Sequence, residues 1–273
     1  MPQYYFDRVN RILQLNRRYG IFKDGDRLIE LGTGWLHWDA IAVRLFFDTE
    51  SVLFDVWDNR QLTGLKNFIL QLDGLLENLD TDDSVKKRAH GNIARIARVE
   101  SFEELYDLLG FKYVIVQSGK LGRLESSSFD IAVSSGVLEH IHVNILPEFV
   151  GDIAALLKPG GYSFNSINLR DHLYAYDKSV SSKQYLSYPD NAWKRWFEND
   201  VQYINRVQRP RWAELFRSAG LELIKEEVEN EDISGLEIAD NYLGYDSVEL
   251  QCAGLRLLHR KPDLKTEIGG RGR

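Results

Sequence analysis

The sequence contains one cysteine, Cys252, among its 273 residues. A single thiol cannot form an intramolecular disulfide, and its scarcity is typical of proteins from a reducing compartment. No apolar run approaches the roughly 20 residues that a membrane-spanning helix needs. The first residues are polar and aromatic, without the basic-then-apolar pattern of a signal peptide. We therefore expect a cytoplasmic protein that does not contact a membrane.

Positive charge is also scarce, since 34 lysine and arginine residues stand against 41 aspartate and glutamate residues, for a net charge of −7. Proteins that bind nucleic acid usually present a basic surface. The tightest basic group, Arg206, Arg209 and Arg211, suits a solvated helix face or a bound anion. We therefore expect no nucleic-acid partner.

Two common catalytic motifs are absent. No histidine pair has the H-E-x-x-H spacing of a zinc-binding helix, and His140 with His142 offers too few ligands for a metal site. The G-x-S-x-G turn of serine hydrolases does not occur either. We therefore expect no metal and no serine nucleophile.

Short apolar segments with the character of buried strands alternate with segments of helical periodicity, which is typical of an α/β fold. The expected strands are 27–31, 51–55, 112–117, 129–135, 162–168, 221–228 and 247–258. The expected helices around them are 4–19, 39–47, 147–157 and 211–219.

Two stretches interrupt this alternation. Residues 59–110 are polar and helix-favouring, with far more residues than a plain crossover needs, and predict a helical insertion. Residues 169–211 are rich in aromatic side chains and predict a cap or lid, although such a cluster can also be ordinary core. We expect one domain over 1–262, with an N-terminal helix in 1–20 and a disordered tail at 263–273.

The glycine turn after the first expected strand indicates a ligand site. Gly32 and Gly34 can adopt positive φ and let a ligand approach the backbone. Asp55 ends the second expected strand, about 20 residues further on, where an acid can accept hydrogen bonds from ribose hydroxyls. A dinucleotide would require a third glycine for its pyrophosphate, but His37 occupies that position. This difference argues against NAD.

The ordered motifs resemble those of class I S-adenosylmethionine-dependent methyltransferases. The residues that carry the resemblance are Glu30-Leu31-Gly32-Thr33-Gly34, Asp55, Ser128-Phe129-Asp130-Ile131-Ala132, Val137-Leu138-Glu139-His140-Ile141 and Leu156-Leu157-Lys158-Pro159-Gly160-Gly161. Each motif alone is weak, but their order is specific. The resemblance implies a Rossmann-like, seven-stranded, mostly parallel sheet with an antiparallel last strand and helical cap insertions, and S-adenosylmethionine as cofactor.

The resemblance also implies a set of cofactor residues, which are Glu30, Gly32, Thr33, Gly34, Asp55, Ser118, Gly119 and Ser135. Glu30 would attract the cofactor's ammonium group, and Asp55 would hold the ribose. Many relatives carry an aspartate where this chain has Ser118, so adenine recognition here lacks charge assistance. The Gly119 amide would face adenine N1.

The expected reaction transfers a methyl group to a small molecule, such as the hydroxyl of a sugar or a specialised metabolite. A general base is needed only if the acceptor arrives protonated. The candidates are His140, after the fourth strand, and His172, after the fifth, with His172 favoured. His140 could equally bond a backbone group, and Asp171 would point away from His172.

Two alternative functions remain open at the level of sequence. A non-catalytic cofactor-binding or scaffold protein could retain the same fold. An RNA or protein methyltransferase would need a basic groove or a peptide channel. A homodimer is compatible with the sequence, which does not determine the oligomeric state.

Overall fold

The computed structural model describes residues 1–198 and 203–263. Its centre is a seven-stranded sheet in the order β3-β2-β1-β4-β5-β7-β6. The strands are β1 (Arg27–Leu31), β2 (Glu50–Asp55), β3 (Phe111–Ile115), β4 (Phe129–Ser135), β5 (Leu157–Asn168), β6 (Glu222–Asn230) and β7 (Cys252–Arg260). Strand β7 runs antiparallel to β5 and β6, and the pairs among β1 to β5 are parallel. The predicted fold class is therefore confirmed.

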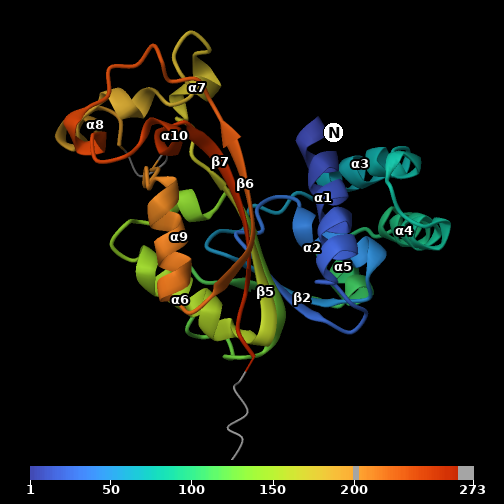
Figure 1. Cartoon of the computed structure of the whole chain (residues 1–273). Helices are drawn as coiled ribbons and strands as arrows, with labels where there is room; N and C mark the ends of the chain where they lie inside the picture. Colours follow the sequence, from blue (N-terminus) through green and yellow to red (C-terminus); the bar gives the residue numbers. More distant parts are fainter. Residues whose placement is uncertain (199–202, 264–273) are drawn as a thin grey trace, which may run out of the picture.

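Helices cover both faces of this sheet (Figure 1). The larger helices are α1 (Gln3–Tyr19), α2 (Trp38–Phe46), α3 (Leu62–Asp73), α4 (Asp83–Ile96), α5 (Phe102–Leu109), α6 (Leu146–Leu156) and α9 (Arg209–Ser218). The first five contribute to one hydrophobic cluster, and α6 and α9 contribute to a second cluster across the sheet. The sheet is thus the middle layer of three.

The alternation of side chains along β1 shows how the sequence specifies these layers. Leu28 belongs to the cluster on the α2 face, whereas Ile29 and Leu31 belong to the cluster on the α6 face. Successive side chains of a strand point to opposite faces. Glu30 therefore lies on the α2 side, which decides its partners.

Two sequence predictions of strand bounds are corrected by the structure. Strand β5 begins at Leu157 rather than at 162, and the pairing shifts between Phe129 and Ile131 of β4, so the residues 158–161 form a bulge. Residues 247–250 form helix α10 (Ser247–Leu250) rather than strand, because Asp246 and Glu249 make a reciprocal capping box. Strand β7 starts only at Cys252.

The expected helical insertion contains α3, α4, α5 and the short helix η1 (Leu76–Asn78). The expected cap segment contains α7 (Leu173–Tyr176), η3 (Gln184–Ser187) and α8 (Asp190–Trp196), while its residues 199–202 lie outside the described residues. The predicted tail, except for Asp263, also lies outside them. The division of the chain into these units stays a prediction.

A second connection, between β6 and β7, joins the cap segment. A separate hydrophobic cluster contains Tyr185 and Trp193 from the first segment together with Ile233 and Tyr242 from the second. The β6–β7 connection also contains η4 (Asp240–Tyr242) and α10. Figure 1 shows α7, α8 and α10 gathered beyond one end of the sheet. We use "the cap" below for residues 169–198, 203–208 and 231–250.

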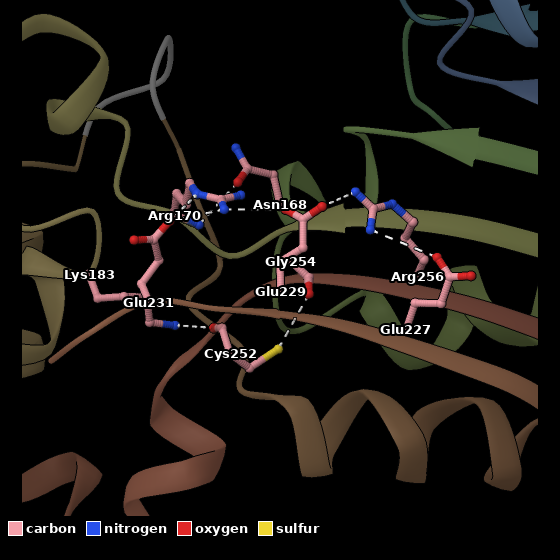
Figure 2. A network of polar contacts seen from close by, with 9 residues as sticks. All are labelled: Asn168, Arg170, Lys183, Glu227, Glu229, Glu231, Cys252, Gly254 and Arg256. Carbon is pink, nitrogen blue, oxygen red and sulfur yellow. Dashed lines mark hydrogen bonds and ion pairs between the residues drawn. The ribbon is translucent and has the colours of Figure 1, made fainter. Parts of the chain in front are cut away.

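Polar contacts fix the cap to the sheet (Figure 2). The buried Lys183 donates from Nζ to the Cys252 carbonyl at 2.7 Å. Arg170 pairs with Glu229 and Glu231 at 3.2 and 3.1 Å. Burial lowers the pKa of Lys183 to about 7. The attachment therefore combines a desolvated amine with half-buried ion pairs.

Within the described residues, no helix is both long enough and apolar enough to span a bilayer. Across residues 1–198 and 203–263, no group of three or more histidine, cysteine, aspartate or glutamate side chains is placed to hold a metal ion.

Candidate functional site

A cavity of about 980 Å³ lies at the carboxyl ends of the parallel strands. The connections that follow β1, β2, β3 and β4 all contribute to its wall. Ligands of open parallel sheets bind at this edge, near the point where the strand order reverses. The sequence-predicted site residues that line it are Gly32, Gly34, Asp55, Ser118, Gly119 and His140.

The two positions of the turn require glycine for different structural reasons. Both have positive φ, at +64° for Gly32 and +58° for Gly34. A Cβ on Gly32 would lie 2.4 Å from Val137 Cγ2, in the connection after β4, whereas a Cβ on Gly34 would meet no atom within 4 Å. Gly32 therefore permits the close approach of two loops, and Gly34 leaves space open beside the cavity.

Asp55 is held by the same turn that it faces. Its Oδ2 accepts from the Gly34 amide at 2.8 Å, and its Oδ1 accepts from the Val56 amide at 2.7 Å. The side chain is 7 % exposed, so its orientation is set by backbone donors rather than by water. An ionised carboxylate has about four acceptor positions. Asp55 can therefore accept further hydrogen bonds from hydroxyl groups in the cavity.

The connection after β3 brings Ser118 and Gly119 to the wall beside Asp55. The Gly119 amide donates to the Val116 carbonyl at 2.8 Å and closes a local turn. In this conformation that N–H is already used, so the Ser118 hydroxyl is the better placed polar group for an adenine edge. The roles of both residues stay predictions.

Glu30 is buried away from the cavity wall. Its carboxylate oxygens accept from the backbone amides of Asp39 and Ala40, at 3.3 and 3.0 Å, in the first turn of α2. Burial and the neighbouring Asp39 raise the pKa of the Glu30 carboxyl above its ordinary value. A carboxylate there satisfies helix N-terminal amides. Its predicted role toward a cofactor ammonium stays a prediction.

Polar contacts on the α2 side involve Thr33 and Ser135, the other two predicted cofactor residues that do not line the cavity. Ser135 donates from Oγ to Asp39 Oδ2 at 2.8 Å, and Arg8 of α1 pairs with the same carboxylate. Thr33 Oγ1 contacts His37 Nδ1. Arg8 and Asp39 could not be assigned to the site from sequence, since each lies on a helix face with no motif of its own.

His37 completes the support of the glycine turn from the opposite side. Its Nε2 lies 2.9 Å from the Tyr106 hydroxyl, and its ring is fully buried. Burial, with a smaller effect of Arg60, lowers the pKa of His37 to about 4. A neutral imidazole at this position packs the turn, so His37 serves the site as support.

The structure brings the two candidate bases together, although they follow different strands. The rings of His140 and His172 have centroids 5.1 Å apart at an interplanar angle of 49°. His140 lines the cavity, and its Nδ1 lies 2.8 Å from the Tyr203 carbonyl oxygen. His172 lies behind His140, and burial followed by the nearby His140 lowers the pKa of His172. The residue beside the cavity is therefore His140 rather than the favoured His172.

The aspartate next to His172 has a separate function. Asp171 Oδ1 accepts from the Leu173 amide at 2.8 Å, which holds the start of α7. This local bond is an Asx-type turn contact. Asp171 thus serves the start of α7.

Several lining residues could not be assigned from sequence. Trp35 and Trp57, which are 61 % and 62 % exposed, border the cavity next to the glycine turn and Asp55. Phe149 and Asp152 reach it from α6. Burial, then Glu148, raises the pKa of Asp152. Their only sequence signal is position, since each lies in the turn after a strand or in a helix that follows one.

Comparisons with known proteins agree with this geometry. A sequence family described as "Methyltransferase domain" matches residues 1–226. Among curated proteins, none matches the sequence significantly.

Solved structures share the fold. A candidate methyltransferase from Bacillus halodurans C-125 is 13 % identical, with a TM-score of 0.51, over 93 % of this chain and 98 % of that one. A candidate sarcosine dimethylglycine methyltransferase from Galdieria sulphuraria is 13 % identical, with a TM-score of 0.52, over 93 % of this chain and 85 % of that one.

The third similar structure is the phosphoethanolamine N-methyltransferase 2 of Haemonchus contortus in complex with S-adenosyl-L-methionine. It is 15 % identical, with a TM-score of 0.50, over 93 % of this chain and 53 % of that chain. At such identities the likeness concerns the fold alone.

Proposed function

Because the chain belongs to the methyltransferase-domain family and is an S-adenosylmethionine-dependent methyltransferase, we propose that it methylates a small molecule held between His140 and the cap. The observation that carries the proposal is His140, which lines the cavity with the ring of His172 from the cap packed against it. A base there would be needed for a weakly acidic nucleophile, such as a hydroxyl.

The residues present fit the cofactor. Asp55 has free acceptor positions for ribose hydroxyls, and Gly34 leaves open space where a side chain would stand. Ser118 offers a neutral hydroxyl for the adenine edge. When bound, S-adenosylmethionine supplies a methyl group that its sulfonium already activates. The chain's own work is then to align the acceptor.

His140 is the proposed proton acceptor. When the acceptor hydroxyl takes the methyl group from the cofactor, its proton would pass to a ring nitrogen of His140. His172 packs against this ring, and burial lowers the pKa of His172. The unprotonated nitrogen of a neutral imidazole is the atom that can accept a proton.

The acceptor class is proposed to be a hydroxyl compound of modest size. A cavity of about 980 Å³ lies at the upper end of the range for small-molecule sites. Apolar side chains such as Ile141 and Ile145 share its wall with His140 and His142. This mixture suits a compact metabolite with one reactive polar group.

The experiment has two steps. Calorimetry with S-adenosylhomocysteine first measures cofactor binding, and a panel of sugars, phenols and amines is then screened by mass spectrometry for a gain of one methyl group. We expect binding, and products from hydroxyl compounds. His140→Ala should leave binding within about twofold and abolish turnover, while His90→Ala on α4 serves as the control. Absence of binding, or turnover that survives His140→Ala, would overturn the proposal.

A further inference from the structure

A strap of the cap crosses the connection that carries His140. We define the strap as residues 203–207, which run from the cap to the start of α9. The main-chain N–H of Asn205 donates to the main-chain carbonyl of Glu139 at 2.8 Å, and Tyr203 Oη accepts from the main-chain N–H of Val143 at 3.1 Å. The strap therefore contacts this connection on both sides of His140.

Asn205 makes the most extensive of these contacts. Its Nδ2 donates to the carbonyls of Leu138 and Ile141, at 2.8 and 3.0 Å, while its Oδ1 accepts from the Val207 amide at 3.2 Å. Leu138 is the first residue of the short helix η2 (Leu138–His140), and Ile141 follows its last residue. The Asn205 side chain thus gives two carbonyls of this segment a hydrogen-bond donor, and a three-residue 3-10 helix has few hydrogen bonds of its own.

The other end of the strap is attached to the cap core. Arg206 has φ of +53° and donates to Asp190 at 2.9 Å and to the Tyr242 hydroxyl at 3.0 Å. Its guanidinium also lies 5.2 Å from the centroid of the Trp193 ring. A positive φ at a non-glycine residue persists only where its surroundings impose it. The strap is therefore placed by the cap and in turn places His140.

The Tyr203 carbonyl determines which nitrogen of His140 carries a proton. A carbonyl oxygen can only accept, so His140 Nδ1, at 2.8 Å from it, must be the donor. In a neutral imidazole one nitrogen is a donor and the other an acceptor. The Nε2 of His140 is then unprotonated, although Nε2–H is the tautomer that free histidine favours.

From these contacts we infer that Asn205 is a positioning residue, which seats the strap so that the Tyr203 carbonyl holds His140 in the Nδ1–H tautomer with Nε2 as the proton acceptor. The role of Nε2 as the proton acceptor rests on the proposed function. The tautomer itself can be observed without any substrate.

The test is nitrogen NMR of the full chain with labelled histidine, at a pH where His140 is neutral. His140→Gln identifies the His140 signals. In the wild-type protein we expect the proton on Nδ1 and an unprotonated Nε2. In Asn205→Ala we expect the Nε2–H tautomer to appear as a major form. Asn191→Ala, an exposed asparagine on α8, should leave the His140 signals unchanged.

Folding and function are checked separately. Asn205→Asp keeps the acceptor for the Val207 amide but loses both donors, so it should shift the tautomer as Asn205→Ala does. Affinity for S-adenosylhomocysteine should change by less than about threefold in both variants, which shows that the chain is folded. A wild-type protein with Nε2–H, or an unchanged tautomer in both folded variants, would overturn the inference. Failure to bind S-adenosylhomocysteine in the wild type would instead overturn the proposed function.

Discussion

The two halves of the cavity are held in different ways. At the ends of β1 and β2, Asp55 is oriented by the amides of Gly34 and Val56, which belong to the turns beside it. At the ends of β4 and β5, His140 is oriented by the carbonyl of Tyr203, which lies 63 residues away in the chain. The first half is fixed by local backbone geometry, and the second half depends on the cap.

This difference explains why the two halves carry different information in the sequence. A turn that orients its own ligand residue needs particular residue types at fixed spacing, and so it leaves a motif. A histidine held by a distant main-chain carbonyl leaves no motif, because any residue can supply a carbonyl.

Four predictions, from the largest effect to the smallest, test whether the Asp55 half of the cavity is fixed by its own turns.

Replacement of Asp55 should have the largest effect. Asp55→Ala removes a carboxylate that can accept two ribose hydroxyls, at about 2 kcal/mol each for charge-assisted bonds, so the affinity for S-adenosylhomocysteine should fall about 1000-fold. Calorimetry measures this loss. Asp58→Ala, an exposed acid of the same turn that pairs with Arg60, is the matched control and should bind normally. Equal affinities for the two variants would remove Asp55 from the ribose role.

Acid should destabilise the protein through His37. Its pKa is about 4 in the folded chain and 6.5 when unfolded, so between these values only the unfolded chain takes up the proton. His37 alone should therefore lower the free energy of unfolding by about 3 kcal/mol as the pH drops from 6.5 to 4. Urea denaturation at several pH values measures this slope.

His259 provides an internal comparison for the acid effect. It is buried in β7, and burial lowers its pKa to about 4 as well. His37→Gln should therefore flatten the pH dependence of stability by about half and leave the part due to His259. A slope that His37→Gln does not change would mean that the glycine turn is not supported by a neutral, buried imidazole.

The two glycines of the turn should differ when each is replaced by alanine. Positive φ costs an alanine about 1 kcal/mol at either position. Gly32→Ala adds a clash with Val137, so it should destabilise the fold by about 2 kcal/mol more than Gly34→Ala. Val137→Ala in the Gly32→Ala background should recover part of that difference. Equal costs for the two alanine variants would contradict the contact between the loops.

Loss of the Ser118 hydroxyl should have the smallest effect. A neutral hydrogen bond contributes about 1 kcal/mol, so Ser118→Ala should weaken the binding of S-adenosylhomocysteine less than 10-fold. The same calorimetric assay measures it beside Asp55→Ala. If the two variants lost similar affinity, contacts with the adenine edge would contribute as much to binding as contacts with the ribose, which would contradict the leading role of Asp55.

Sequence patterns predicted most of the sheet because they depend on local rules. Strands β1 and β4 have the predicted bounds, since each is an apolar run that ends at glycine or serine turn residues. Residues 247–250 were predicted wrongly because apolar content outweighed the Asp246–Glu249 capping box. The bulge at 158–161 was missed because a Pro-Gly-Gly stretch predicts an end rather than a distortion.

The site residues divide along the same line. The glycine turn and Asp55 were identified from spacing, and the structure places them together on the cavity wall. Glu30 was predicted to attract the cofactor's ammonium group, which stays a prediction, and the structure shows its carboxylate bound to the amides of α2. Strand alternation already predicts that Glu30 lies on the same face as Leu28. Only the packing of α2 on that face shows that backbone amides are the donors to its carboxylate.

By itself the sequence determined the fold class and the cofactor, and it predicted the glycine turn as the cofactor site, because each follows from short-range patterns of glycine, acid and apolar residues. Only the tertiary structure decided that His140 lines the cavity in front of His172, and that the strap sets the tautomer of His140. Those contacts join β4, β5 and the cap, which are distant in the chain. Their geometry depends on how the cap packs, and no local pattern records it.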